Sequence, residues 1–404
     1  MKAEGAADDS ERQREHLLWV LSGLTFLIFF QAYMVAPLIP RLSEVFGVST
    51  QRVGLLVPAY LIPYGVATLF LGLLSDRIGR RPILLASLLT FIALTGLTAT
   101  AKSASEMILW RLLTGLGASG VVPLALTLMG NLFPYEQRGR PLGWLFGAMA
   151  GGASFGAWGG VLLEPIIGWR TLFLGVAVFA AAVALLLLPY RRLLGIGKPQ
   201  LSLSVGEVFA GYRDLLSTLR GVRTYCYVFI NSVFHSGVFT WLGVYFSSNY
   251  GLGEWGIGLA LLGYGIPGFL LGPVIGRAAD RWGRRWLIPL GLGLAAVSGA
   301  ALMLQPPLLV AALAVMILSL GYDMTQPLFA GVVTQLGGKR GGQAMGLNVF
   351  ALFTGMGLGS LLFGEALRLG FPVALGLFAI VLLLAAVLAI PLFRSERPPR
   401  AAGG

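Results

Sequence analysis

The chain has 404 residues, of which 56% are hydrophobic and only 11% are charged, and its formal net charge is +12. Soluble domains carry about 25% charged residues. This composition therefore excludes a solvated multidomain enzyme, a disordered chain and a disulfide scaffold. The single cysteine, Cys226, cannot form an internal disulfide. What remains is a polytopic membrane protein.

Long apolar runs divide the chain into two sets of helices. A helix needs about 20 mostly apolar residues to cross a hydrocarbon core of roughly 30 Å. The sequence predicts membrane helices over 17–38, 53–74, 83–101, 106–129, 141–163 and 169–190, and a second set over 223–246, 255–276, 286–304, 308–334, 343–364 and 371–393. These runs are too long and too uniformly apolar for barrel strands. The predicted fold class is an all-α membrane protein with twelve transmembrane helices.

The basic residues predict the orientation in the membrane. The termini and the even-numbered connections hold 23 of the 29 Lys and Arg residues, and the opposite side holds 6. By the positive-inside rule both termini are cytoplasmic, in a bacterial-type inner membrane. The positive net charge is thus explained by the orientation of the protein in the membrane and does not indicate a nucleic-acid partner. The expected organisation is a cytoplasmic tail over 1–16, six-helix bundles over 17–190 and 223–393, a cytoplasmic central connection over 191–222, and a cytoplasmic tail over 394–404.

An internal repeat relates the two predicted bundles. Residues 72–81 read GLLSDRIGRR and residues 276–285 read GRAADRWGRR, a constant shift of 204. Five further identities continue upstream at the same shift, from Gly54 to Pro63. Both copies lie where a predicted helix reaches the cytoplasm.

The repeated stretch resembles the signature of the major facilitator superfamily, Gly-x-x-x-Asp-Arg-x-Gly-Arg-Arg. The resemblance implies two pseudo-symmetric six-helix bundles around a central cavity, a small-molecule substrate, and a latch that closes the cytoplasmic side. A turn with topogenic arginines is the simpler alternative. The latch would comprise Gly72, Asp76, Arg77, Gly79, Arg80, Arg81, Gly276, Asp280, Arg281, Gly283, Arg284 and Arg285.

Two shorter stretches resemble the drug–proton antiporter branch of that family. Pro37 and Pro40 match its Pro-x-x-Pro at the end of helix 1, and the run from Arg111 to Ala118 is close to its helix 4 pattern. In the helix 5 pattern Phe155-Gly156 stands where Gly-Pro is expected. The resemblance implies efflux of an amphipathic, drug-like solute with protons as the coupling ion. Proton-coupled or facilitative uptake of a metabolite is the alternative, and a non-transporting receptor is a third.

The glycine-rich run from Gly115 to Gly120 also matches the dinucleotide motif GxGxxG. It lies inside an apolar span without a preceding strand, so the required context is absent. Small residues at this spacing let membrane helices pack closely. We expect no cofactor, no metal site and no enzyme activity. The protein should be a monomer among membrane lipids.

Three ionisable residues are candidates for proton coupling, because such side chains are costly inside a membrane. Asp323 is placed near the midplane of helix 10, and a structural hydrogen-bond acceptor is the alternative. His235 lies near the midplane of helix 7, where it could relay a proton, bind substrate or simply pack. Arg111 belongs to the helix 4 pattern, which implies proton coupling, or it could snorkel to the outer surface. Glu164 and Glu365 are predicted to be solvated carboxylates at outer helix ends.

The remaining candidates would line the cavity with amide and aromatic groups, although ordinary packing explains each of them equally well. A cavity with few charges suits an amphipathic organic solute. These residues are Gln31, Tyr33, Tyr60, Asn231, Trp241, Tyr264, Gln326 and Asn348.

Overall fold

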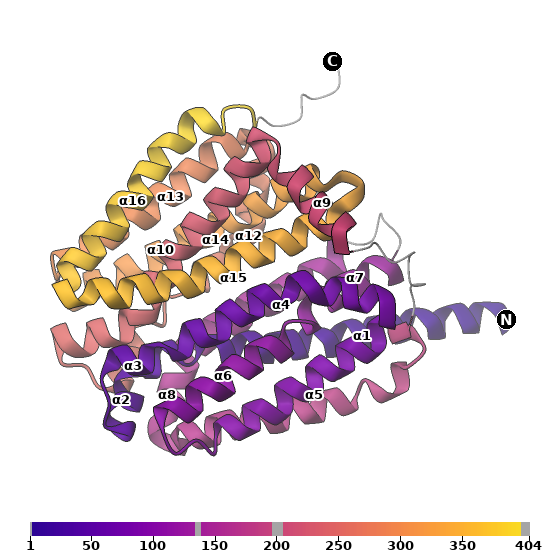
Figure 1. The fold of residues 1–404 in the computed structure, drawn as a ribbon, viewed down its shortest axis with the longest axis horizontal. Helices are drawn as coiled ribbons and strands as arrows, with labels where there is room; N and C mark the ends of the chain where they lie inside the picture. The colour runs from indigo at the N-terminus through magenta and orange to yellow at the C-terminus, as the bar shows by residue number, and fades with distance from the viewer. Residues whose placement is uncertain (1, 134–138, 196–204, 397–404) are drawn as a thin grey trace.

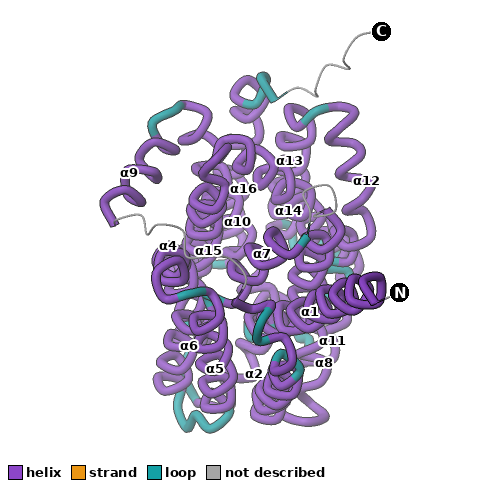
Figure 2. Tube along the Cα trace, turned by 90° about the vertical axis from the view of Figure 1, so that its right-hand side faces the viewer, coloured by secondary structure: helices purple, strands orange, loops and turns teal. Residues whose placement is uncertain are grey.

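The structure is a computed structural model that describes residues 2–133, 139–195 and 205–396. Within these ranges every regular element is a helix (Figure 2). Nine helical stretches of this part of the chain are long and apolar enough to cross a membrane. The prediction of an all-α membrane fold is confirmed.

The first half of the chain forms one bundle. Its elements are α1 (Lys2–Tyr33), η1 (Ala36–Leu38), α2 (Ile39–Phe46), α3 (Thr50–Gly54), α4 (Leu56–Ile78), α5 (Arg80–Thr98), α6 (Ala104–Ala118), α7 (Val121–Leu132) and α8 (Gly139–Leu185). Gly168, at φ 76° and ψ 151°, breaks α8 into two passes. Two short 3₁₀ turns, Leu188–Tyr190 and Leu193–Gly195, follow.

The second half forms the other bundle. Its elements are α9 (Val205–Leu216), α10 (Leu219–Tyr250), α11 (Glu254–Ala260), α12 (Ile266–Trp282), α13 (Arg284–Met303), α14 (Leu308–Gly337), η5 (Gly338–Arg340), α15 (Gly341–Ala366), η6 (Leu367–Leu369) and α16 (Phe371–Leu392). The amphipathic helix α9 lies against this bundle, where Arg340 pairs with Asp214 at 2.7 Å.

Helix boundaries differ from the predicted ones where polar residues or breaks occur. Helix α1 begins at Lys2 rather than at residue 17, because the scan for apolar runs does not register polar helix formers. The predicted helices 106–129 and 255–276 are each interrupted, at Ser119–Gly120 and at Leu261–Gly265.

The two bundles lie side by side (Figure 1). They meet through α4 against α15, α8 against α11 and α12, and α10 against η1 and α2. We call the end of the helices that holds Gly79 and Gly283 the motif end, and the opposite end the far end. Gly79 and Gly283 have φ values of 102° and 82°, and each precedes the next helix. Residues other than glycine rarely adopt such a positive φ. The repeat predicted from the sequence is therefore confirmed as a turn that occurs once in each bundle.

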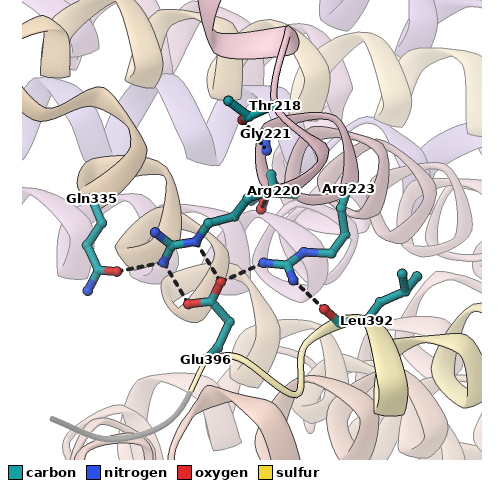
Figure 3. Close-up of polar contacts among 8 residues, drawn as sticks. Thr218, Arg220, Gly221, Arg223, Gln335, Leu392 and Glu396 are labelled. Carbon is teal, nitrogen blue, oxygen red and sulfur yellow. Dashed lines mark hydrogen bonds and ion pairs between the residues drawn. The ribbon is translucent and has the colours of Figure 1, made fainter.

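At the motif end of the second bundle, one carboxylate joins three helices (Figure 3). Glu396 lies just after α16 and is buried. Arg223 and Arg220 of α10 bind its two oxygens at 2.5 and 2.7 Å, and Arg220 also donates to Gln335 of α14 at 2.8 Å. Burial alone would raise the pKa of Glu396, but the two arginines outweigh it and hold that pKa below its ordinary value.

Candidate functional site

A small cavity lies between the two bundles. Its volume is about 10 Å³, which is about the room that one water needs. The first bundle contributes Ala32, Tyr33, Ala36, Val57 and Leu61, and the second contributes His235, Ser236, Phe239 and Met356. The two bundles are thus closely packed against each other around this cavity.

Three aromatic rings of the cavity wall belong to a larger group of stacked rings that connects the two bundles. His235 of α10 lies flat on Tyr322 of α14, with ring centres 3.5 Å apart and planes 14° apart. Its Nε2 is 2.6 Å from the hydroxyl of Tyr264. Phe239 stacks on Tyr264 and contacts Tyr33 of the first bundle, at centroid distances of 4.5 and 5.4 Å. We call these five residues the aromatic cluster.

Asp323 lies on α14 and is partly exposed. Ser319, one helical turn earlier, donates a hydrogen bond to Asp323 Oδ2 at 3.2 Å. The amide of Gly265 donates to Ser319 Oγ at 2.7 Å. Among the residues whose side chains the structure describes, no cation pairs with this carboxylate. The hydrogen bond that the structure shows for this carboxylate therefore comes from a neutral hydroxyl.

The series of hydrogen bonds that starts at Asp323 ends at the interface between the bundles. Gly265 has φ 77° and lies in the break between α11 and α12. A Cβ atom at this position would collide with Ser154 of α8. Two hydrogen bonds therefore connect an acid inside the second bundle to a helix break that touches the first.

Arg111 forms a separate buried cluster in the first bundle. Its side chain is fully buried, so the alternative of snorkelling to the surface is wrong. Nη1 donates to Gln31 Oε1 at 2.9 Å and Nε donates to the Leu56 carbonyl at 3.2 Å. The guanidinium carbon lies 4.4 Å from the centre of the Tyr60 ring. Arg111 thus ties the end of α1 to the start of α4.

The other predicted cavity residues lie at several places in the second bundle. Asn231 donates to Thr325 Oγ1 at 2.8 Å, and Trp241 donates to the Ser360 carbonyl at 3.0 Å. In the described part of the chain, Gln326 Nε2 and Asn348 Oδ1 are buried without a hydrogen-bond partner. Neither residue lines the small cavity.

The repeated motif is only partly described. Arg77, Arg81 and Arg281 are exposed, and Arg80, Arg284 and Arg285 are partly exposed. The predicted latch residues Gly72, Asp76, Gly276 and Asp280 lie outside the residues whose side chains the structure describes.

An ion cluster at the far end corrects one prediction. Glu164 of α8 is buried rather than solvated, since Arg41 of α2 binds it at 3.2 Å. Arg41 also lies 3.6 Å from Glu254 of α11, in the other bundle. Glu365 is exposed as predicted and pairs with Arg368 at 3.0 Å.

Sequence reasoning missed several of these residues. Ser319 lies four residues before Asp323, and Phe239 lies four residues after His235, so helical spacing was the available signal. Tyr322 is adjacent to Asp323. The contacts of Arg41 and Gly265 join distant segments and leave no local signal.

Comparisons with known proteins agree on one family. The family model described as Major Facilitator Superfamily matches residues 21–336 and 246–403. The uncharacterized MFS-type transporter YwfA of Bacillus subtilis is 28% identical over 88% of this chain and 85% of its own length. A chloramphenicol resistance protein of Streptomyces lividans is 29% identical over 62% of this chain and 63% of its own. A crystal structure of a bacterial homolog of the human lysosomal transporter Spinster, inward-facing and unoccupied, superposes with a TM-score of 0.76 at 17% identity over 96% of this chain and 99% of the other.

Proposed function

The chain belongs to the Major Facilitator Superfamily, and from this premise we propose that it exports a small amphipathic organic solute in exchange for protons. It is an integral, multi-pass membrane transporter and not an enzyme. Direction, coupling ion and substrate class are the parts that we propose.

The proposed orientation places the motif end in the cytoplasm of a bacterial cell. The excess of Lys and Arg in the segments at this end supports it. Both termini and the central connection 191–222 then lie in the cytoplasm. The bundles 17–190 and 223–393 rock against each other, and the repeated arginine turns close the cytoplasmic side in the alternate state.

The observation that supports proton coupling is the series of hydrogen bonds from Asp323 through Ser319 to Gly265. An ionised carboxylate inside a membrane is costly, and protonation removes that cost. The cost differs between two conformations if the surroundings of the carboxylate differ, and protonation then shifts the balance between them. The helix break at Gly265 touches the first bundle, so the hydrogen bonds of Asp323 are coupled to the contact that rocking changes.

The aromatic cluster supports an amphipathic substrate. Aromatic rings supply large apolar faces, and the tyrosine hydroxyls and His235 supply a few polar groups. Gln326 Nε2 and Asn348 Oδ1 add two polar atoms that have no hydrogen-bond partner in the described part of the chain. In this proposal Tyr33, Tyr264 and His235 contact the solute, while Arg111 positions α1 through Gln31. The similarity to a chloramphenicol resistance protein makes chloramphenicol the first solute to test.

The test is flux in proteoliposomes with an imposed pH gradient. Wild-type protein should accumulate radiolabelled chloramphenicol against its gradient when protons move the other way. Asp323→Asn should lose this pH-driven accumulation but keep chloramphenicol exchange without a gradient. Asp214→Asn is the control, because Asp214 is an exposed surface acid. If Asp323→Asn remains pH-driven, the coupling role is wrong, and accumulation along the proton gradient would instead indicate uptake by symport.

A further inference from the structure

A second, larger cavity lies at the motif end of the second bundle, away from the centre. Its volume is about 310 Å³, within the range of about 300 to 1,000 Å³ that small-molecule pockets occupy. It is lined by Arg285 and Trp286 at the start of α13, by Ile390 and Pro391 at the end of α16, and by Arg394 just after α16. Helices α13 and α16 pack along their lengths.

The arginines of the cavity have no carboxylate partner among the residues whose side chains the structure describes. Glu396 lies nearby, but Arg220 and Arg223 use both of its carboxylate oxygens, and only its backbone carbonyl accepts from the Arg285 amide at 3.2 Å. Among the residues whose side chains the structure describes, neither Arg285 nor Arg394 pairs with a carboxylate. Arg285 Nε is buried and has no partner in the same part of the chain. Two guanidinium groups and one unused donor thus favour an anion.

An apolar surface continues from the cavity toward the centre of the membrane. Trp286 is exposed, and its ring centre lies 5.4 Å from the guanidinium carbon of Arg285. Leu290 follows one turn later on α13, and Val387 precedes Ile390 by one turn on α16, and all of them are exposed. The charged cavity therefore lies at the boundary between a lipid-facing helix surface and the polar end of the bundle.

We propose that this cavity binds the phosphodiester headgroup of an anionic phospholipid, with its acyl chains along the exposed residues of α13 and α16. Arg285 and Arg394 bind the phosphate oxygens, and Trp286 lies at the level of the glycerol backbone. The apolar surface distinguishes a lipid from a soluble phosphate, since a soluble anion gains nothing from Leu290 or Val387.

Binding to the purified full-length protein in detergent tests the proposal. Native mass spectrometry would measure the dissociation constant of the first bound lipid for phosphatidylglycerol and for phosphatidylcholine, with glycerol phosphate as the soluble anion. Phosphatidylglycerol should bind more tightly than either. Arg394→Gln should weaken phosphatidylglycerol binding about fivefold, the effect of one basic residue near an anionic surface. Arg192→Gln should not, because it removes an exposed arginine of the central connection that does not line this cavity.

A second variant separates headgroup from chain recognition. Trp286→Ala should weaken phosphatidylglycerol binding and leave glycerol phosphate binding unchanged. Equal binding of phosphatidylcholine, an equal effect of Arg192→Gln, or full competition by glycerol phosphate at the same concentration would each overturn the lipid site. A thermal unfolding midpoint within the scatter of the wild type shows that each variant is folded.

Discussion

Replacing Glu396 by Gln removes the charge at the centre of the cluster that joins α10, α14 and α16 and keeps the shape of the side chain. The carboxylate is 4% exposed and its partner Arg223 is 7% exposed, whereas Arg220 is 40% exposed. The two halves of this ion cluster should therefore contribute very differently to stability.

The expected loss follows from that difference in burial. The pair with Arg220 is screened by solvent and contributes at most about 1 kcal/mol. Loss of the partner of a buried charge costs about 3 to 5 kcal/mol. Arg223 keeps the Leu392 carbonyl and the Phe393 ring, whose centre lies 4.2 Å away, and these contacts offset part of the cost. We expect Glu396→Gln to lower the free energy of unfolding by about 3 kcal/mol.

The measurement is the free energy of unfolding in mixed micelles, followed by circular dichroism as SDS is added. Glu365→Gln is the matched control, because Glu365 forms an Arg pair of 3.0 Å in which both side chains are exposed. That control should lose less than about 1 kcal/mol. Equal losses in the two variants would refute the assignment of a buried, structural ion pair to Glu396.

Three further results are expected. The pKa of Glu396 is held below its ordinary value of 4.5, so the stabilisation by its charge is complete above pH 4.5 and is lost as the pH falls through the lowered pKa. The difference in unfolding free energy between wild type and Glu396→Gln should therefore shrink on acidification. A difference that stays constant with pH would contradict this. Gly283→Ala should cost about 1 to 3 kcal/mol in a thermal unfolding assay, because alanine does not readily adopt φ 82° with ψ 155°. Gly115→Ala should cost about 1 to 3 kcal/mol because its Cβ would collide with the Tyr60 carbonyl, whereas Gly130→Ala, which has open space, should be neutral in the same assay.

The predictions that succeeded rest on local physics. Apolar runs in the sequence locate membrane helices, because a helix that crosses the membrane has few polar residues whatever its neighbours are. The repeated Gly79 and Gly283 identify a turn, because the backbone conformation there depends on the residue itself. The Asp323 candidate also follows from one side chain and its predicted depth in the membrane, but its role in proton coupling stays a prediction.

What the sequence could not predict depends on contacts between distant segments. Nothing near Glu164 indicates that Arg41 binds it, so its burial was missed. The break at Gly265 lies in an apolar run that was predicted as one helix, and the contact of Gly265 with Ser154 joins two distant segments. Arg111 has its partners on two other helices, so its burial could not be told from snorkelling.

The far-end ion cluster has a consequence for the energy of opening. Arg41 and Glu164 belong to the same bundle, and Glu254 belongs to the other. A motion that separates the bundles at this end takes Glu254 away from Arg41 but leaves Glu164 bound. The Arg41 guanidinium therefore keeps a counter-ion before and after this motion. Glu254, which is already partly exposed, moves toward water. In the proposed rocking motion, opening the far end would therefore separate the ion pair whose acid is partly exposed and leave the pair with buried Glu164 intact.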